Sequence, residues 1–156
     1  MSNVYLCSFK GTKPGWQGWV ERITRFFTKS IYSHSEISVG NPFDGAVLCV
    51  SSVGTEGGVR GKVMQLDPKD WDILPLPTVY PQQVLNFLAA HKGEPYDLIG
   101  CVRSVLPFVS HEHATKYFCS EVCATVIGIQ DPWRMHPGVL HMVMSERKEV
   151  AHSGPY

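Results

Sequence analysis

One cysteine of this chain lies where a helix would make its thiol reactive. Residues 119–129, CSEVCATVIGI, predict a helix that begins at Cys119, and this cysteine falls on the apolar face of that helix. Unpaired backbone N–H groups and the dipole at a helix N-terminus stabilise an anion, so a thiol there has a lowered pKa. The thiolate is a nucleophile, and the same N–H groups could hold an oxyanion that develops on a substrate carbonyl. The alternative is a buried structural cysteine, and the helix pattern alone favours that interpretation.

His34 is the best candidate for the base that a thiol nucleophile requires. Residues 32–39, YSHSEISV, alternate as a strand with His34 in its interior, whereas the other histidines lie in predicted loops, near helix ends or in the C-terminal tail. Glu36 shares the face of His34 and lies about 7 Å along the strand. The sequence therefore predicts a Cys119–His34 pair. A hydrogen-bonded structural His34 and a solvated Glu36 remain the alternatives.

The same region also allows a metal site. His111, His113, Cys119 and Cys123 occur as H-x-H-x5-C-x3-C, and all four are zinc-type ligands. The spacing differs from the usual structural zinc patterns because C-x2-C is absent. The alternative is a polar loop around the two histidines and a core position for Cys123.

Composition limits the class of protein. The chain has 156 residues, the size of one domain, with 44% apolar and 18% charged residues, so extensive disorder is not expected. Lys plus Arg is 14 and Asp plus Glu is 14, which leaves no basic excess for a general nucleic-acid partner. Because no apolar run reaches the ~18 residues of a membrane span, no stable membrane insertion is expected. The N-terminus does not resemble a secretory signal, and an odd, scattered set of cysteines favours thiols in a reducing compartment, so the expected location is cytoplasmic.

The elements that must position these residues form a strand-rich part followed by a helix-rich part. Strands are predicted at 3–9, 32–39, 46–53, 59–66 and 71–76, the last one at a sheet edge because of its prolines. Helices are predicted at 17–29, 81–92, 97–106, 119–129 and 136–148. The fold class is therefore α+β, a small antiparallel sheet packed with helices, in one domain over 1–150 with a tail at 151–156. Four aromatic residues, Trp16, Trp19, Phe26 and Phe27, could line a groove, although core packing is their more common use.

Four segments, taken in order, resemble one family. They are YSHSEI at 32–37, GGVR at 57–60, GEPYD at 93–97 and FCSEVCA at 118–124. This set is similar to the circularly permuted branch of the NlpC/P60 superfamily of papain-like thiol hydrolases, the YiiX-like group, with lecithin:retinol acyltransferase as a more distant relative. In that branch the histidine strand precedes the cysteine helix, as here. The resemblance spans roughly residues 30–130 and implies a circularly permuted papain-like fold with Cys119 as nucleophile and His34 as base.

The third member of the implied site departs from the family pattern. The family commonly has an orienting carboxylate on the strand after the histidine strand, where this chain has Ser51. Glu36, Ser51 or Glu56 could orient the imidazole, and the sequence slightly favours Glu36. Its role would be to fix the tautomer and the orientation of His34.

The implied reaction is acyl transfer through an acyl-enzyme, and it needs no cofactor. The substrate would be a peptide, another amide or an acyl lipid. A cell-wall peptide would require another export route, such as lysis during phage infection. A catalytically silent binding module on the same fold is the alternative from another class. The sequence does not indicate an oligomeric state.

Overall fold

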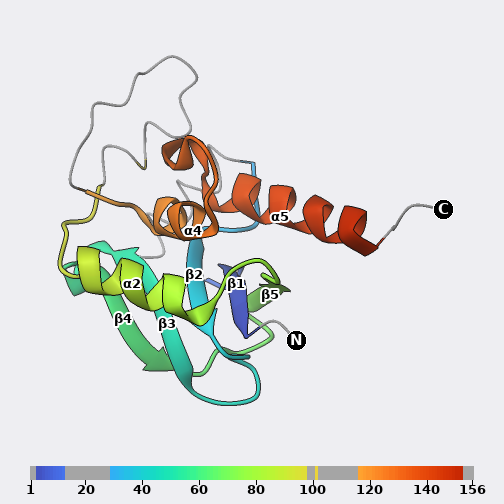
Figure 1. The fold of residues 1–156 in the computed structure, drawn as a ribbon, viewed down its shortest axis with the longest axis horizontal. Coiled ribbons are helices and arrows are strands. Elements are labelled where there is room, and N and C mark those ends of the chain that lie inside the picture. The colour runs from blue at the N-terminus through green and yellow to red at the C-terminus, as the bar shows by residue number, and fades with distance from the viewer. Residues whose placement is uncertain (1–2, 13–28, 98–100, 102–115, 153–156) are drawn as a thin grey trace.

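One antiparallel sheet of five strands forms the centre of the described structure (Figure 1). The computed structural model describes residues 3–12, 29–97, 101 and 116–152. In space the strand order is β4-β3-β2-β1-β5. The strands are β1 (Val4–Phe9), β2 (His34–Val39), β3 (Val47–Val53), β4 (Gly58–Met64) and β5 (Trp71–Pro75).

Strand β2 lies at the centre of this sheet. Ile37 pairs with Leu6 of β1 on one side and with Val50 of β3 on the other. The predicted hairpin of β2 and β3 is therefore present, and β5 lies at an edge, as its prolines indicated. Because side chains alternate along a strand, the two faces of β2 carry different residues.

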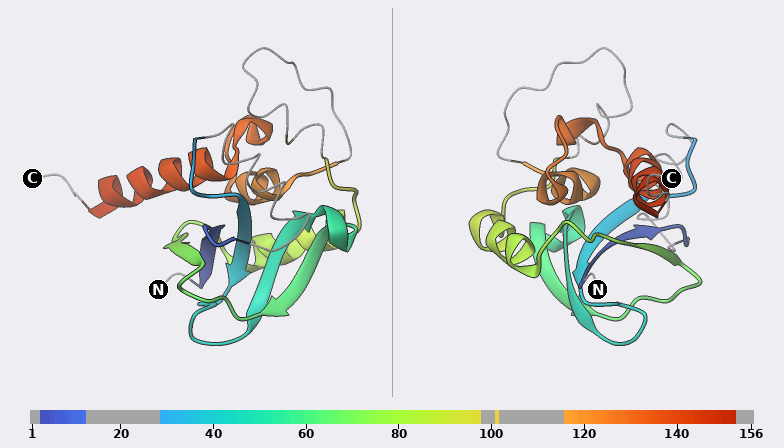
Figure 2. Two further views of the ribbon diagram at one scale, coloured as in Figure 1. Left: turned by 180° about the vertical axis from the view of Figure 1, so that it is seen from behind. Right: turned by 45° about the vertical axis from the view of Figure 1, so that its right-hand side comes forward.

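The described residues include three α-helices, which pack on one side of the sheet (Figure 2). They are α2 (Pro81–His91), α4 (Cys119–Ile127) and α5 (Pro137–His152), with short 3-10 turns η1 (Gly54–Glu56) and η2 (Pro132–Arg134). Helix α4 lies on β2 and β3, α2 contacts β4, β2 and α4, and α5 contacts β1, β5 and α4. In the described part of the chain, no helix is both long enough and apolar enough to cross a bilayer.

The main core lies between the sheet and these helices. Its buried members include Leu6, Ile37 and Val50 from the sheet and Val122 and Leu140 from the helices. A smaller cluster covers the opposite face with Cys7, Phe9, Leu66 and Trp71. Burial of these apolar side chains on both faces is the main force that holds β2 in place.

The predicted α+β class is confirmed, and the predicted strands and helices within the described residues are all present. The last helix is longer than predicted: α5 continues to His152, so the predicted tail is helical at its first two positions. The predicted helices at 17–29 and 97–106 and the residues Trp16, Trp19, Phe26 and Phe27 lie wholly or mostly outside the described residues.

Candidate active site

Cys119 is the first residue of α4, as the sequence predicted, and it is 3% exposed. Phe118 before it is extended, and the backbone N–H of Phe118 donates to the Glu121 carboxylate, which helps to fix where the helix begins. The backbone N–H groups of Ser35 and Ser120 hydrogen-bond to the Cys119 sulfur. The start of α4 and the start of β2 therefore meet at this thiol.

His34 is the first residue of β2 and does not lie in the interior of a strand, so that part of the prediction is wrong. The reason is that β1 ends at Phe9, the partner of His34, and the ladder cannot extend further. The side chain of His34 is 15% exposed and lies edge-on to Trp71, with ring centroids 6.1 Å apart. Its imidazole hydrogen-bonds to the Cys119 side chain.

Glu36 hydrogen-bonds to the His34 imidazole at Nε2. Its Oε1 lies 2.9 Å from Nε2 of His34, which leaves Nδ1 as the ring nitrogen for the Cys119 thiol. The Glu36 side chain is only 1% exposed, so the interpretation of Glu36 as a solvated strand residue is wrong. The structure thus brings Cys119, His34 and Glu36 into one connected set.

Ser51 and Glu56, the other two candidates for the orienting group, form different contacts. The Ser51 hydroxyl donates to the backbone oxygen of Ser35 at 2.7 Å. The Glu56 carboxylate pairs with Arg60 and Lys62. Among the described residues, Glu36 is therefore the carboxylate or hydroxyl side chain that contacts the His34 ring at Nε2.

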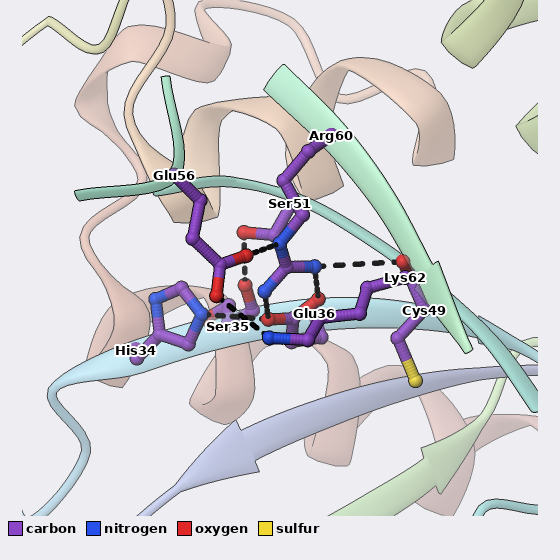
Figure 3. Close-up of polar contacts among 8 residues, drawn as sticks. All are labelled: His34, Ser35, Glu36, Cys49, Ser51, Glu56, Arg60 and Lys62. Carbon is purple, nitrogen blue, oxygen red and sulfur yellow. Dashed lines mark hydrogen bonds and ion pairs between the residues drawn. The ribbon is translucent and has the colours of Figure 1, made fainter. Parts of the chain in front are cut away.

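Arg60 is part of this network and was given no role from the sequence (Figure 3). Its guanidinium donates to both oxygens of Glu36, with Nη2 2.6 Å from Oε1 and Nη1 2.7 Å from Oε2. Its Nε lies 2.6 Å from Oε2 of Glu56, whose Oε1 lies 2.8 Å from Nζ of Lys62. The only signal in the sequence is that GGVR belongs to the resemblance. Locating Arg60 next to Glu36 requires the pairing of β3 with β4.

Electrostatics separate Cys119 from the other four cysteines, all of which lie within the described residues. Burial raises the pKa of Cys49 and of Cys101 to about 12, and it raises the pKa of Cys7 and Cys123 strongly. Burial also disfavours the Cys119 thiolate. The charge of His34, its hydrogen bond and the N–H groups of Ser35 and Ser120 outweigh burial, so the pKa of Cys119 is lowered.

The pKa of His34 is raised and the pKa of Glu36 is lowered, so both shifts favour the charged forms. Burial lowers the pKa of His34, but the Cys119 charge and hydrogen bond, followed by Glu36, outweigh it and raise this pKa to about 9. Burial also works against the Glu36 carboxylate, yet His34 and then Arg60 hold the pKa of Glu36 below its ordinary value. The three shifts therefore favour the thiolate of Cys119, the imidazolium of His34 and the carboxylate of Glu36.

The GEPYD segment connects β4 to the residues before the nucleophile. The Val59 N–H donates to Glu94 O at 2.9 Å, and Tyr117 N–H donates to Pro95 O at 3.2 Å. Gly58 allows this approach because its φ is +102° and a Cβ there would collide with the Glu94 carbonyl oxygen. Tyr96 lies near the site, since burial and then the Cys119 charge raise its pKa.

Two serine hydroxyls are buried without a hydrogen-bond partner in the described part of the chain. They are Ser35 and Ser120, whose backbone N–H groups bind Cys119. Both residues have no exposed surface. Buried hydroxyls without partners are uncommon in folded proteins.

The zinc alternative depends on residues that are only partly described. His111 and His113 lie outside the described residues, so their position relative to Cys119 and Cys123 is not given. Within the described ranges, no group of three or more His, Cys, Asp or Glu side chains could hold a metal ion. Cys123 is fully buried in the main core, which agrees with the structural role expected for it.

Comparison with family models, with curated proteins and with solved structures finds no match for this chain. The geometry of Cys119, His34 and Glu36 is therefore the basis for a function.

Proposed function

We propose that the protein is a cysteine-dependent hydrolase or acyltransferase that uses Cys119 as nucleophile, His34 as acid–base partner and Glu36 as orienting group. The observation that carries this proposal is one connected set of contacts: the Cys119 side chain hydrogen-bonds to the His34 imidazole, and Nε2 of His34 lies 2.9 Å from Oε1 of Glu36. The lowered pKa of Cys119, in contrast to the raised pKa of the other cysteines, agrees with this geometry. A buried structural thiol is stable without an imidazole such as that of His34 and without N–H donors such as those of Ser35 and Ser120. A nucleophilic thiolate needs such partners.

The reaction would begin from the ion pair of Cys119 and His34. The thiolate attacks a carbonyl carbon, and the sulfur–carbon bond forms while the carbonyl oxygen takes the negative charge. The backbone N–H of Cys119, at the start of α4, would stabilise this oxyanion. When the carbon–nitrogen or carbon–oxygen bond breaks, the His34 imidazolium donates its proton to the leaving group.

The second half of the reaction releases the acyl group. Neutral His34 takes a proton from water or from another acceptor as that molecule attacks the thioester. Sulfur then leaves as the thiolate, and the ion pair is restored. Glu36 keeps Nε2 of His34 as a donor throughout, so that Nδ1 is the nitrogen that exchanges the proton.

Further support for a circularly permuted papain-like fold comes from the positions of the four family-like segments. The segment at 32–37 supplies His34, GGVR supplies the start of β4, GEPYD bonds to Val59, and the last segment supplies Cys119. Segments far apart in the chain are thus connected by contacts: Arg60 of GGVR contacts Glu36 of the first segment, and Glu94 of GEPYD accepts from Val59. On this basis we propose that the protein is similar to the NlpC/P60-like, YiiX-like group.

Peptides, other amides and acyl lipids are the substrate classes that suit this chemistry, because each presents a carbonyl with a leaving group. A cytoplasmic location remains part of this proposal, as expected from the sequence.

The direct test is to trap the acyl-enzyme. The protein is mixed with a panel of activated acyl esters and amides, quenched in acid and analysed by peptide mass spectrometry. We expect an acyl adduct on the peptide that contains Cys119, and no adduct there in Cys119→Ser or His34→Ala. An unmodified Cys119 across the panel, with product release equal to that of Cys119→Ser, would contradict the proposal and favour a silent binding module.

A further inference from the structure

The Glu36 carboxylate lies in a place where a carboxyl group is normally neutral. Its side chain is 1% exposed, and the removal of a carboxylate from water costs several kcal/mol unless charges and hydrogen bonds compensate. On the β2 side it has one contact, from Nε2 of His34. The remaining compensation comes from Arg60 on β4, which contacts both of its oxygens.

We propose that Arg60 is a positioning residue of this site, which holds the Glu36 carboxylate charged and oriented so that His34 can exchange a proton with Cys119. This inference rests on the proposed function, because a positioning role requires the catalytic pair. Arg60 lies on β4, a different strand from His34 and Glu36, and it acts on the catalytic pair entirely through Glu36.

The geometry of the guanidinium fixes the plane of the carboxylate. Two N–H···O contacts, of 2.6 and 2.7 Å, join the guanidinium to both oxygens of the carboxylate. Oε1 is shared between Nη2 of Arg60 and Nε2 of His34, so the orientation that Arg60 imposes is the one that faces the imidazole. A lysine ammonium is a single point charge and could not impose this plane.

The charge state of Glu36 decides which nitrogen of His34 carries the proton. A charged Glu36 accepts the Nε2 proton, and neutral His34 then has Nδ1 unprotonated and able to accept from Cys119. A protonated Glu36 would donate to Nε2 instead, and neutral His34 would then carry its proton on Nδ1. That tautomer cannot act as the base for Cys119.

Arg60 is itself anchored from outside the site. Its side chain is 13% exposed, and Nε pairs with Glu56, which is 34% exposed. Glu56 also pairs with Lys62, which is 53% exposed. Exposed ion pairs of this kind contribute little to stability. A variant that removes the Lys62–Glu56 pair is therefore a control for variants that remove the Arg60–Glu36 pair.

Other ionisable groups near Glu36 do not replace Arg60. The groups that interact with Glu36 are His34 on its own strand, Arg60 on β4, and three thiols from β1, β3 and α4, namely Cys7, Cys49 and Cys123. Burial raises the pKa of all three thiols, so each is neutral near pH 7. Arg60 is therefore the fixed positive charge that Glu36 contacts among the described residues.

The test measures two properties of the site that do not require a substrate. The first is the rate of Cys119 alkylation by iodoacetamide from pH 5 to 10, and the second is the pKa of His34 by NMR of 15N-labelled histidine. Arg60→Met is expected to slow alkylation at pH 6 by about tenfold or more, which corresponds to one pKa unit for Cys119. Arg60→Lys is expected to lie between Arg60→Met and the unchanged protein, and Lys62→Met to match the unchanged protein.

A double variant separates action through Glu36 from an independent effect. If Arg60 acts only through Glu36, then adding Arg60→Met to Glu36→Gln changes neither the alkylation profile nor the His34 pKa further. A further shift in that background would overturn the inference. A folded Arg60→Met variant with the alkylation profile of the unchanged protein would also overturn it. If Arg60→Met does not fold, an Arg60→Lys variant with the alkylation profile of the unchanged protein would overturn it.

The outcome also distinguishes this inference from the proposed function. If the unchanged protein reacts at pH 6 no faster than an ordinary thiol, then the proposed function fails, whatever Arg60 does. If the unchanged protein reacts rapidly and Arg60→Met does so equally, then only the role of Arg60 fails.

Discussion

Glu36 and His34 are two positions apart on the same strand, and Oε1 of Glu36 lies 2.9 Å from Nε2 of His34. Strand alternation places such residues on one face, so β2 alone supplies the imidazole and its orienting carboxylate. The tertiary fold then places Cys119 at the other ring nitrogen and Arg60 at the carboxylate. Both depend on how α4 and β4 are placed around β2.

Replacing the nucleophile is expected to remove activity and leave the fold intact. Cys119→Ala deletes one buried sulfur and should lower hydrolysis or acyl transfer by about 10³-fold or more, to the level that the remaining site supports. Thermal unfolding should show a cooperative transition close to that of the unchanged protein. Full activity of Cys119→Ala would exclude the enzymatic interpretation, and Cys123→Ala, one turn further along α4, is the matched control.

Removing the charge of Glu36 should weaken His34 as a base. In Glu36→Gln the pKa of His34 is expected to fall from about 9, since the carboxylate is one of the groups that raise it. The rate of acyl-enzyme formation should fall by up to about 10⁴-fold, the loss found when the orienting carboxylate of a Ser-His-Asp triad is changed to the amide. NMR titration of His34 and single-turnover kinetics are the measurements. An unchanged His34 pKa in this variant would show that Glu36 does not orient the ring.

The dependence of activity on pH should be bell-shaped. Activity rises with pH as Cys119 loses its proton, and the lowered pKa of Cys119 places this rise below the range of an ordinary thiol. Activity falls again near pH 9, where the imidazolium of His34 loses the proton that the leaving group needs. The profile of kcat/KM against pH tests both limbs. A single rise near pH 8.5 with no fall near pH 9 would mean that the thiol acts without His34.

Gly58 should be far less tolerant of substitution than its neighbour Gly57. Both have positive φ, but a Cβ at Gly58 would collide with the carbonyl oxygen of Glu94, whereas a Cβ at Gly57 would meet no atom within 4 Å. Gly58→Ala is expected to lower the free energy of unfolding by about 3 kcal/mol, and Gly57→Ala by about 1 kcal/mol. Denaturant unfolding of the two variants measures the difference. Equal losses would show that the contact between β4 and Glu94 is not required.

Local patterns in the sequence were sufficient for the parts of the site that depend on one element. The start of α4 followed from the apolar spacing after Cys119, and the shared face of His34 and Glu36 followed from their separation by two residues. The edge position of β5 followed from its prolines. Each of these features is a property of one segment, so no knowledge of its neighbours was needed.

The features that the sequence could not provide depend on contacts between elements. Glu36 is buried because Arg60 and His34 cover it, although its strand carries polar residues on both faces. The position of Arg60 next to the site follows only from the pairing of β3 with β4, in which Ser51 is the partner of Arg60. His34 begins β2 because β1 ends opposite it at Phe9, a limit set by the partner strand. The family resemblance itself stays a prediction.

If His34 activates Cys119, then Cys119 should react before the other four cysteines, and competitive alkylation measures this order. The native protein is treated with substoichiometric iodoacetamide at about pH 6, where a thiol of pKa ~8.5 is almost entirely protonated, and the adduct is located by peptide mass spectrometry. We predict that Cys119 is labelled first and alone, and that His34→Ala removes this preference. Slow labelling, spread over all five cysteines, or labelling of Cys119 that His34→Ala leaves unchanged, would contradict it.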